Sequence, residues 1–188
     1  IIRIEDTDRA RLVEGAEEKI FNAIDLFGLQ EDESVRRSGE VGPYRQSERK
    51  DLYDKYIKEL IEKDGAYYCF CSKERLDALR AGQAAAKEHI MYDGRCLELS
   101  LTEAKKRLDE PHVVRLKVPK EQRNYKISDE IRGEVEFDLS LIEDSVLIKS
   151  DGFPTYHFAV VVDDHLMNIT DVIRGEEWIS STPKHNLI

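Results

Sequence analysis

The chain has 188 residues, of which 40% are hydrophobic and 36% are charged, so it can bury a core within one large domain or one domain with an insert. Its formal net charge of -10 disfavours long-range attraction to nucleic acid, so any RNA site must be a local basic patch. No run reaches the roughly 20 apolar residues of a membrane span, no export leader is present, and three cysteines suit no closed disulfide framework, so we expect a soluble, cytoplasmic protein.

The first predicted elements are a short strand and a helix. Ile2 and Ile4 alternate with charged residues, which is the period of a half-buried strand. Apolar residues then recur every three or four positions over residues 9–27, which predicts an amphipathic helix that Gly28 ends. A second helix is predicted from Leu52 to Ile61, with Gly65 at its end.

Composition changes near residue 67, where a cysteine cluster begins, and we predict an inserted α+β module over residues 67–150. Helical patterns cover residues 73–90 and 100–108, and Ser100 with Glu103 matches a capping box. Alternating apolar residues predict strands at 114–118, 135–137 and 146–148. Residues 1–66 and 151–188 are then the two parts of the larger α/β fold.

Basic residues gather within this module and form its most plausible phosphate-facing surface. Lysine and arginine neutralise backbone phosphates without reading base identity. The simpler alternative is an ordinary solvated face. The residues predicted to face RNA are Lys105, Arg107, Arg115 and Lys117.

Three cysteines in the module, Cys69, Cys71 and Cys96, can supply most of a tetrahedral zinc site. The usual pairs of cysteines separated by two residues are absent, so buried free thiols are the alternative. The fourth ligand is open among Tyr92, His89, Asp93 and water.

The stretch over residues 152–178 resembles the wall of a binding cleft, because reactive residues interrupt apolar runs. Asp163, Asp164 and His165 follow one such run, and Arg174 to Trp178 follow another. In open α/β sheets ligands bind at the carboxyl ends of the strands. An ordinary buried element with charged ends is the alternative, so these residues alone support only an α/β ligand-binding protein.

Four ordered segments resemble the bacterial-type glutamyl-tRNA synthetase family of class I. They span nearly the whole chain and are Arg3-Ile-Glu-Asp-Thr-Asp8, Gly42-Pro-Tyr-Arg-Gln-Ser-Glu-Arg49, Lys149-Ser-Asp-Gly-Phe-Pro-Thr-Tyr-His157 and Val172-Ile-Arg-Gly-Glu-Glu-Trp178. The resemblance implies an α/β fold, a Rossmann-like parallel sheet interrupted by an insert that binds the tRNA acceptor stem. It also implies a helix over residues 155–167, where β-branched residues alone would predict a strand.

The resemblance further implies a glutamate site. Glu5 would accept from the amino group, Arg174 would bind a carboxylate with its guanidinium fork, and Tyr156 would offer its hydroxyl nearby. Val160 stands where some relatives have an asparagine that touches glutamate.

Other roles follow from the same resemblance. Glu177 and Trp178 would lie beside ATP, and Thr7, Asp8 and Arg11 are candidates for contact with the terminal nucleotide of tRNA. Several family members bind zinc in the insert, some through a cysteine pair followed by tyrosine and cysteine, which favours Tyr92 as the fourth ligand beside the three cysteines.

The implied reaction attaches glutamate to tRNA(Glu) in two steps through a glutamyl-adenylate, with ATP and Mg²⁺. The implied partners are the tRNA acceptor end, glutamate and ATP, without a membrane, in a monomeric parent enzyme. Such catalysis requires positioning and charge stabilisation more than a protein nucleophile.

The chain departs from the family pattern because it lacks the His-Ile-Gly-His-type and Lys-Met-Ser-Lys-Ser-type signatures and the anticodon-binding domains. We therefore expect a piece of a longer enzyme that does not charge tRNA by itself. The alternatives are a glutaminyl-tRNA synthetase, a synthetase-like protein that glutamylates a modified tRNA base, and a non-catalytic RNA- or glutamate-binding module.

Overall fold

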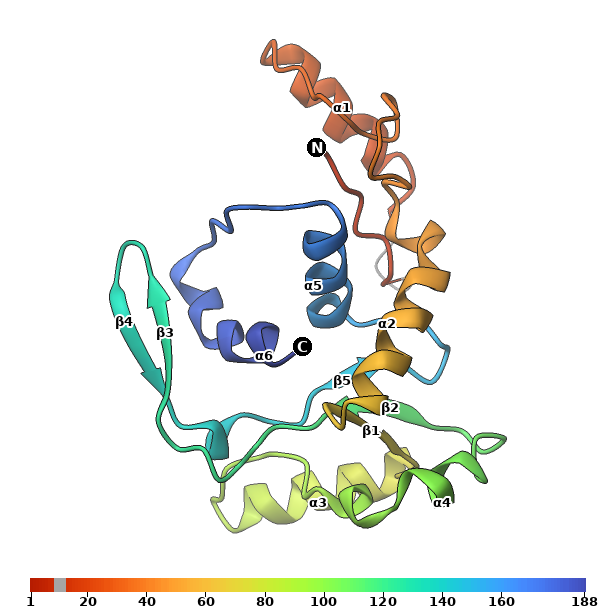
Figure 1. The fold of residues 1–188 in the computed structure, drawn as a ribbon, viewed down its shortest axis with the longest axis vertical. Coiled ribbons are helices and arrows are strands. Elements are labelled where there is room, and N and C mark those ends of the chain that lie inside the picture. Colours follow the sequence, from red (N-terminus) through yellow and green to blue (C-terminus); the bar gives the residue numbers. More distant parts are fainter. Residues whose placement is uncertain (9–12) are drawn as a thin grey trace.

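The computed structural model describes residues 1–8 and 13–188, in which helices and short strands alternate along the chain. The helices are α1 (Ala16–Leu26), α2 (Lys50–Glu62), α3 (Lys73–Ala85), α4 (Leu101–Lys105), α5 (Tyr156–Leu166) and α6 (Thr182–Leu187). The strands are β1 (Ala66–Cys69), β2 (Val113–Leu116), β3 (Tyr125–Asp129), β4 (Gly133–Phe137) and β5 (Val146–Ile148). Figure 1 shows α1 at the end of the molecule opposite α3 and α4. Within the described residues, no helix is both long and apolar enough to cross a lipid bilayer.

Two antiparallel sheets organise the strands. The first has the order β1-β2-β5, and the second is the β3-β4 hairpin, which projects from the body of the molecule in Figure 1. All strand pairs in these sheets are antiparallel, and across residues 1–8 and 13–188 the one parallel pairing is an isolated bridge between Ile4 and Arg45. The mixture of helices and sheets agrees with the predicted α/β class. Of the predicted Rossmann-like parallel sheet, the described residues contain this single bridge.

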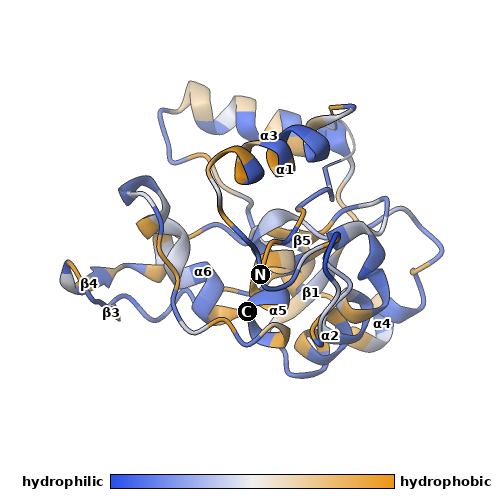
Figure 2. Cartoon of the chain, turned by 90° about the horizontal axis from the view of Figure 1, so that it is seen from above, coloured by the Kyte–Doolittle hydropathy of each residue, from blue (hydrophilic) through white to orange (hydrophobic). Residues whose placement is uncertain are grey.

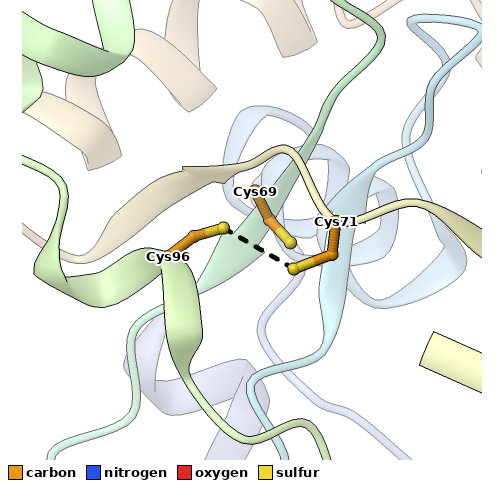
Figure 3. Close-up of side chains that lie close together, drawn as sticks. All are labelled: Cys69, Cys71 and Cys96. Atoms are coloured by element: carbon orange, nitrogen blue, oxygen red, sulfur yellow. Dashed lines mark hydrogen bonds between the residues drawn. The ribbon is translucent and has the colours of Figure 1, made fainter. Parts of the chain in front are cut away.

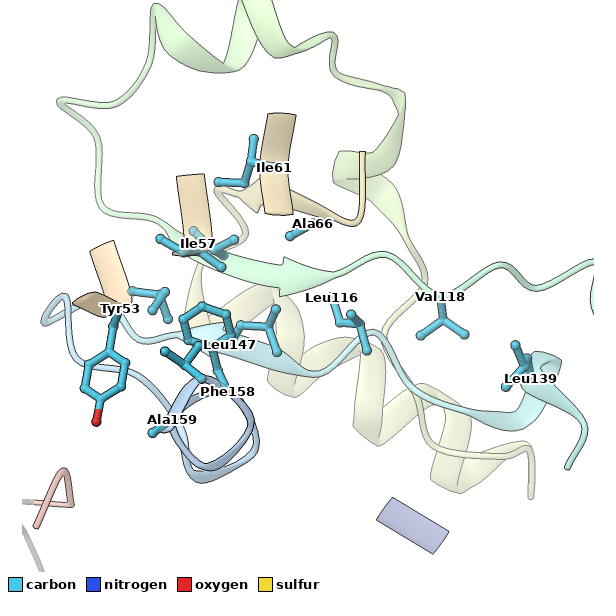
Figure 4. Packing of buried hydrophobic residues seen from close by; sticks show 13 residues of the cluster. Tyr53, Ile57, Ile61, Ala66, Leu116, Val118, Leu139, Leu147, Phe158 and Ala159 are labelled. Atoms are coloured by element: carbon cyan, nitrogen blue, oxygen red, sulfur yellow. The ribbon is translucent and has the colours of Figure 1, made fainter. Parts of the chain in front are cut away.

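One hydrophobic core contains residues from the predicted inserted module and from both parts of the larger α/β fold. It includes Tyr53 and Ile57 from α2, Leu116 from β2, Leu147 from β5 and Phe158 from α5, all buried (Figure 4). The strands of the 67–150 segment therefore pack directly on the helices that flank it in sequence. The module boundaries at residues 67 and 150 stay predictions.

A buried ion pair between Arg49 and Asp163 connects the start of α2 to α5. Nε of Arg49 donates to Oδ1 of Asp163 at 2.7 Å, and both side chains are almost wholly buried, with 1% and 0% exposed. The second oxygen of Asp163 accepts from Nε2 of Gln46 and from the Tyr53 hydroxyl, both at 2.9 Å. Arg49 also donates to the Pro43 carbonyl at 2.8 Å. The buried charges are thus paired and hydrogen-bonded, as burial requires.

The predicted strand at residues 2–4 is an extended segment rather than a ladder. The Ile4 amide donates to the Tyr44 carbonyl at 2.8 Å, and the Gln46 amide donates to the Ile4 carbonyl at 3.0 Å, which makes only one bridge. The helix predicted over residues 9–27 is present from Ala16, because Gly15 before it has a left-handed conformation (φ 73°). Residues 9–12, and with them Arg11, lie outside the described residues.

Three predicted helix ends differ from the structure. The helix predicted to reach residue 90 ends at Ala85, and Lys87 beyond it has a positive φ, which an α-helix does not tolerate. The helix predicted to reach residue 108 ends at Lys105, although its capping box between Ser100 and Glu103 is confirmed. After α2 it is Asp64, not Gly65, that takes the left-handed conformation.

The valine-rich segment before Asp163 is a helix, as the family resemblance implied and against its β-propensity. The Thr155 hydroxyl donates to the Val146 carbonyl at 2.7 Å, which joins the start of α5 to β5, an edge strand of the first sheet. Phe158, Ala159 and Val162 then face the core at helical spacing. Packing of one helical face therefore outweighs the local preference of the valines.

The strands β1 and β3 were not predicted from the sequence. Tyr67 and Tyr68 in β1 are strand-forming residues, but they lie beside Cys69 and Cys71, which are typical of a metal site. In β3, Tyr125 and Ile127 alternate with polar residues, which is a signal that could have been used.

We expect Asp163→Ala to lower the free energy of unfolding by about 3–5 kcal/mol, because it leaves the Arg49 guanidinium buried without its charge partner. Urea unfolding followed by circular dichroism measures the change. The control is Glu59→Ala, which removes an exposed ion pair with Lys63 and should cost less than about 1 kcal/mol. Equal losses in the two variants would contradict this account of α5.

Candidate functional site

A cavity of about 370 Å³ lies between the N-terminal segment, α5 and the loop that follows α5. Its walls include Glu5, Tyr156 and Arg174, the three residues predicted for glutamate, which lie up to 169 positions apart in sequence (174 − 5). Val160 also lines this cavity. The fold therefore brings the predicted carboxylate, hydroxyl and guanidinium groups to one hollow.

Arg3 shares this cavity and holds its acidic side chains in place. Its guanidinium donates from Nη2 to Oε1 of Glu5 and from Nη1 to Oδ1 of Asp164, each at 2.9 Å, and its Nε lies 3.7 Å from Asp163. Burial acts to lower the pKa of Arg3, but hydrogen bonds with Glu5 and Asp164 outweigh it and raise the pKa. About a third of the Glu5 side chain, 35%, stays exposed.

Sequence reasoning gave Arg3 no role, although it lies two residues before Glu5 in the same motif. Its position opposite two acidic side chains from α5 could not be read from the sequence, because those residues are 160 positions or more away (163 − 3).

Arg174, which also lines the cavity, lies beside a pair of histidines. Nη1 of Arg174 lies 2.8 Å from Nδ1 of His185, and Nε2 of His185 lies 2.9 Å from Nδ1 of His157. The ring of Tyr156 lies 5.2 Å from the Trp178 ring, measured between centroids. Burial and the positive charge of Arg174 lower the pKa of His185 to about 4, and burial lowers the pKa of His157. Both histidines are therefore neutral near pH 7.

Four of the residues predicted to contact ATP or the tRNA terminus are described by the structure, and none of the four lines this cavity. Glu177 and Trp178 belong to the 3-10 helix η5 (Glu176–Ser181), and both are exposed. Thr7 is buried, and its carbonyl accepts from Nζ of Lys149 at 3.1 Å. Asp8 is half-buried.

Arg115, one of the four residues predicted to face RNA, lies in the interior of the protein, so this prediction is wrong. Arg115 is 3% exposed, donates to the Asp144 carbonyl at 2.9 Å, and places its guanidinium 4.1 Å from the centre of the Tyr92 ring. The expectation assumed a strand with one solvated face. Instead β2 is the central strand, and both of its faces are covered.

The other three basic residues lie nearer the surface. Lys105 is exposed, Arg107 pairs with Glu110 at 2.8 Å, and Lys117 pairs with Asp64 at 2.6 Å. These ion pairs have exposed partners and contribute little to stability.

The three cysteines converge on one point between β1 and the 3-10 helix η3 (Arg95–Glu98), as Figure 3 shows. Their sulfur atoms all lie within 4.8 Å of one another, and Sγ of Cys71 lies 3.7 Å from Sγ of Cys96. The Tyr92 hydroxyl lies 3.4 Å from Sγ of both Cys69 and Cys71. A tetrahedral zinc with Zn–S bonds of about 2.3 Å requires sulfur atoms about 3.8 Å apart, so the donor set has the size that zinc needs.

Positive charge surrounds the cysteine cluster. Nη1 of Arg75 lies 3.4 Å from Sγ of Cys71, and Arg115 contacts the Tyr92 ring. The hydrogen bond between the two thiols lowers the pKa of Cys69, against the effect of burial, and raises the pKa of Cys96. It therefore favours the thiolate, which is the metal-binding form of cysteine, at Cys69 and the neutral thiol at Cys96. His89, an alternative fourth ligand, is exposed and outside this cluster.

The chain is similar to known proteins over nearly its whole length. Residues 1–188 match the family described as tRNA synthetases class I (E and Q), catalytic domain. The chain is 52% identical to a glutamate-tRNA ligase of Clostridioides difficile and 56% identical to one of Fusobacterium nucleatum, with 98% of the chain covered in each comparison. A crystal structure of a glutamate tRNA ligase from Elizabethkingia meningosepticum in complex with its amino acid has a TM-score of 0.91 and 43% identity over 98% of the chain.

The chain belongs to this class I family of glutamyl- and glutaminyl-tRNA synthetase catalytic domains. It spans 39% of the C. difficile relative, 36% of the F. nucleatum relative and 38% of the E. meningosepticum chain.

Stability should decrease between about pH 6.5 and pH 4 in part because of His185. Its pKa in the folded chain is about 4, below the ordinary value of 6.5, so the unfolded chain binds more protons between these values. Allowing for solvent exposure, we expect a loss of about 1–2 kcal/mol in the free energy of unfolding as the pH falls through this window.

Urea unfolding from pH 7 to pH 4.5 measures this dependence. His185→Asn should reduce it, whereas His89→Asn, at an exposed position, should leave it unchanged. Identical profiles for His185→Asn and the parent chain would refute the assignment.

Proposed function

We propose that the chain is the part of a glutamate-tRNA ligase that binds glutamate and the acceptor end of tRNA(Glu). The longer enzyme would attach glutamate to tRNA in two steps, using ATP with Mg²⁺. The observation that supports this most strongly is the cavity that gathers Glu5, Tyr156 and Arg174 in a chain of this family. It would act in the cytoplasm, as a monomer.

The cavity suits a small zwitterion with a second carboxylate. Its volume of about 370 Å³ lies at the lower end of ordinary ligand pockets. Glu5 would accept from the ammonium group, and Arg174 would donate to a carboxylate. Val160 supplies an apolar wall for the methylene groups, in place of the asparagine contact of some relatives.

The other ligands would lie around this cavity. Glu177 and Trp178 would contact ATP, with Trp178 beside the Tyr156 ring of the glutamate site. Lys105, Arg107 and Lys117 would face the acceptor stem. Thr7, Asp8 and Arg11 would lie near its terminal nucleotide.

Cys69, Cys71 and Cys96 would hold one structural zinc, with Tyr92 as the fourth ligand. The sulfur spacing and the nearby hydroxyl support this proposal. A zinc ion here would connect β1 to the segment around η3 and stabilise the module without taking part in the reaction.

Arg174→Ala should damage glutamate use far more than Lys105→Ala in the full-length protein. Loss of a guanidinium partner from a desolvated pocket costs about 2–5 kcal/mol, whereas one exposed phosphate contact contributes less. Aminoacylation kinetics with glutamate and tRNA varied separately measure both effects, and glutamine serves as the competing amino acid. Small and equal effects would refute the pocket assignment, and charging with glutamine alone would refute the proposed substrate.

Protein purified without chelator should contain about one zinc per chain, because three thiolates and one hydroxyl complete a tetrahedral site. Elemental analysis measures it. Cys96→Ala should lose the zinc, Tyr92→Phe should bind it more weakly, and the control His89→Ala should retain it. Far less than one zinc per correctly folded parent chain would show that the cysteines are buried free thiols.

A further inference from the structure

We propose that His185 is a positioning residue for ligand recognition: through Nδ1 it orients the Arg174 guanidinium, and His157 fixes the tautomer in which it can do so. This inference rests on the proposed role of Arg174 in binding a ligand carboxylate. It assigns to α6 a part in selecting the amino acid, although α6 does not line the cavity.

Arg174 depends on an outside contact for its orientation. It lies in the loop between α5 and η5, and its neighbours Val172 and Ile173 are 59% and 93% exposed, so the loop is weakly anchored by packing. Within residues 1–8 and 13–188, the guanidinium of Arg174 makes one hydrogen bond, to Nδ1 of His185 at 2.8 Å. Without that acceptor, a long side chain on an exposed loop would sample several rotamers.

The direction of the hydrogen bonds determines the protonation of both histidines. Arginine has only donors, so Nδ1 of His185 must accept and its proton must lie on Nε2. That Nε2–H faces Nδ1 of His157 at 2.9 Å, so Nδ1 of His157 must accept in turn. His157, in the first turn of α5, therefore selects the tautomer of His185 that can hold Arg174.

A neutral hydrogen-bond partner such as His185 has a chemical advantage for the Arg174 guanidinium. A carboxylate would bind the guanidinium more strongly, but it would also neutralise the charge that a ligand carboxylate must meet. A protonated histidine could not accept and would repel Arg174. Neutral His185 directs the guanidinium and leaves its full positive charge for an anionic ligand. The Lys184 side chain next to His185 adds to the forces that keep the imidazole neutral.

Two substitutions, His185→Asn and His185→Gln, distinguish the positioning role of His185 from a role in packing alone. The amide oxygen of asparagine can take the place of Nδ1 as the acceptor, whereas the amide oxygen of glutamine lies nearer the place of Nε2. In the full-length protein, we expect His185→Asn to keep the Michaelis constant for glutamate within about threefold of the parent. We expect His185→Gln to raise it about tenfold or more, with kcat and the Michaelis constant for ATP changed by less than about twofold. Thermal unfolding of both variants checks that they fold.

Equal effects of the two variants on glutamate use, whether large or absent, would overturn the inference. Arg174→Ala, measured in parallel, distinguishes the two levels of the argument. If it leaves the Michaelis constant for glutamate unchanged, the proposed ligand site itself is wrong. If it raises that constant while His185→Gln does not, only the role of His185 is wrong.

A spectroscopic measurement on the parent protein tests the same point without a substitution. With ¹⁵N-labelled histidine, long-range ¹H–¹⁵N spectra should show His185 protonated on Nε2 and unprotonated on Nδ1 near pH 7. His157→Phe, which removes the acceptor for that proton, should weaken this preference and raise the Michaelis constant for glutamate. A proton on Nδ1 of His185 in the parent protein would overturn the inference.

Discussion

The site depends on the buried ion pair between Asp163 and Arg49. Since both side chains are shielded from water, each needs the other, and breaking the pair would leave an unpaired charge in the core. The pair determines where α5 lies against α2, and Arg3 reaches the same acidic group at 3.7 Å. The N-terminal segment, α2 and α5 are thus joined by charge as well as by apolar packing. The walls of the cavity follow from this arrangement.

The two ends of α5 then carry different parts of the ligand site. Near its end, Asp163 and Asp164 hold Arg3, which in turn holds Glu5. At its start, Tyr156 lines the cavity and His157 contacts the histidine that meets Arg174. Acidic and basic side chains therefore line the same cavity, and α5 contacts both kinds.

The cysteine cluster forms a second, smaller core that is connected to the first through β2. Arg115 joins them, because it donates to the Asp144 carbonyl and lies over the Tyr92 ring beside the sulfur atoms. Sequence spacing placed this arginine on an RNA-facing surface, since its neighbours Val114 and Leu116 alternate with it. The structure gives it an interior role, because both faces of β2 are covered.

The sequence by itself determined the position of α2, the capping box of α4, the cysteine cluster, and, through the motifs it shares with its family, α5 and the three residues that meet in the cavity. These features depend on local periodicity or on ordered motifs. Only the tertiary structure decided the burial of Arg115, the place of Arg3 between Glu5 and Asp164, and the contact of His185 with Arg174. The physical reason is that hydrophobic periodicity reports which face of one element is buried, whereas the partner of a charged group is selected by elements far away in sequence.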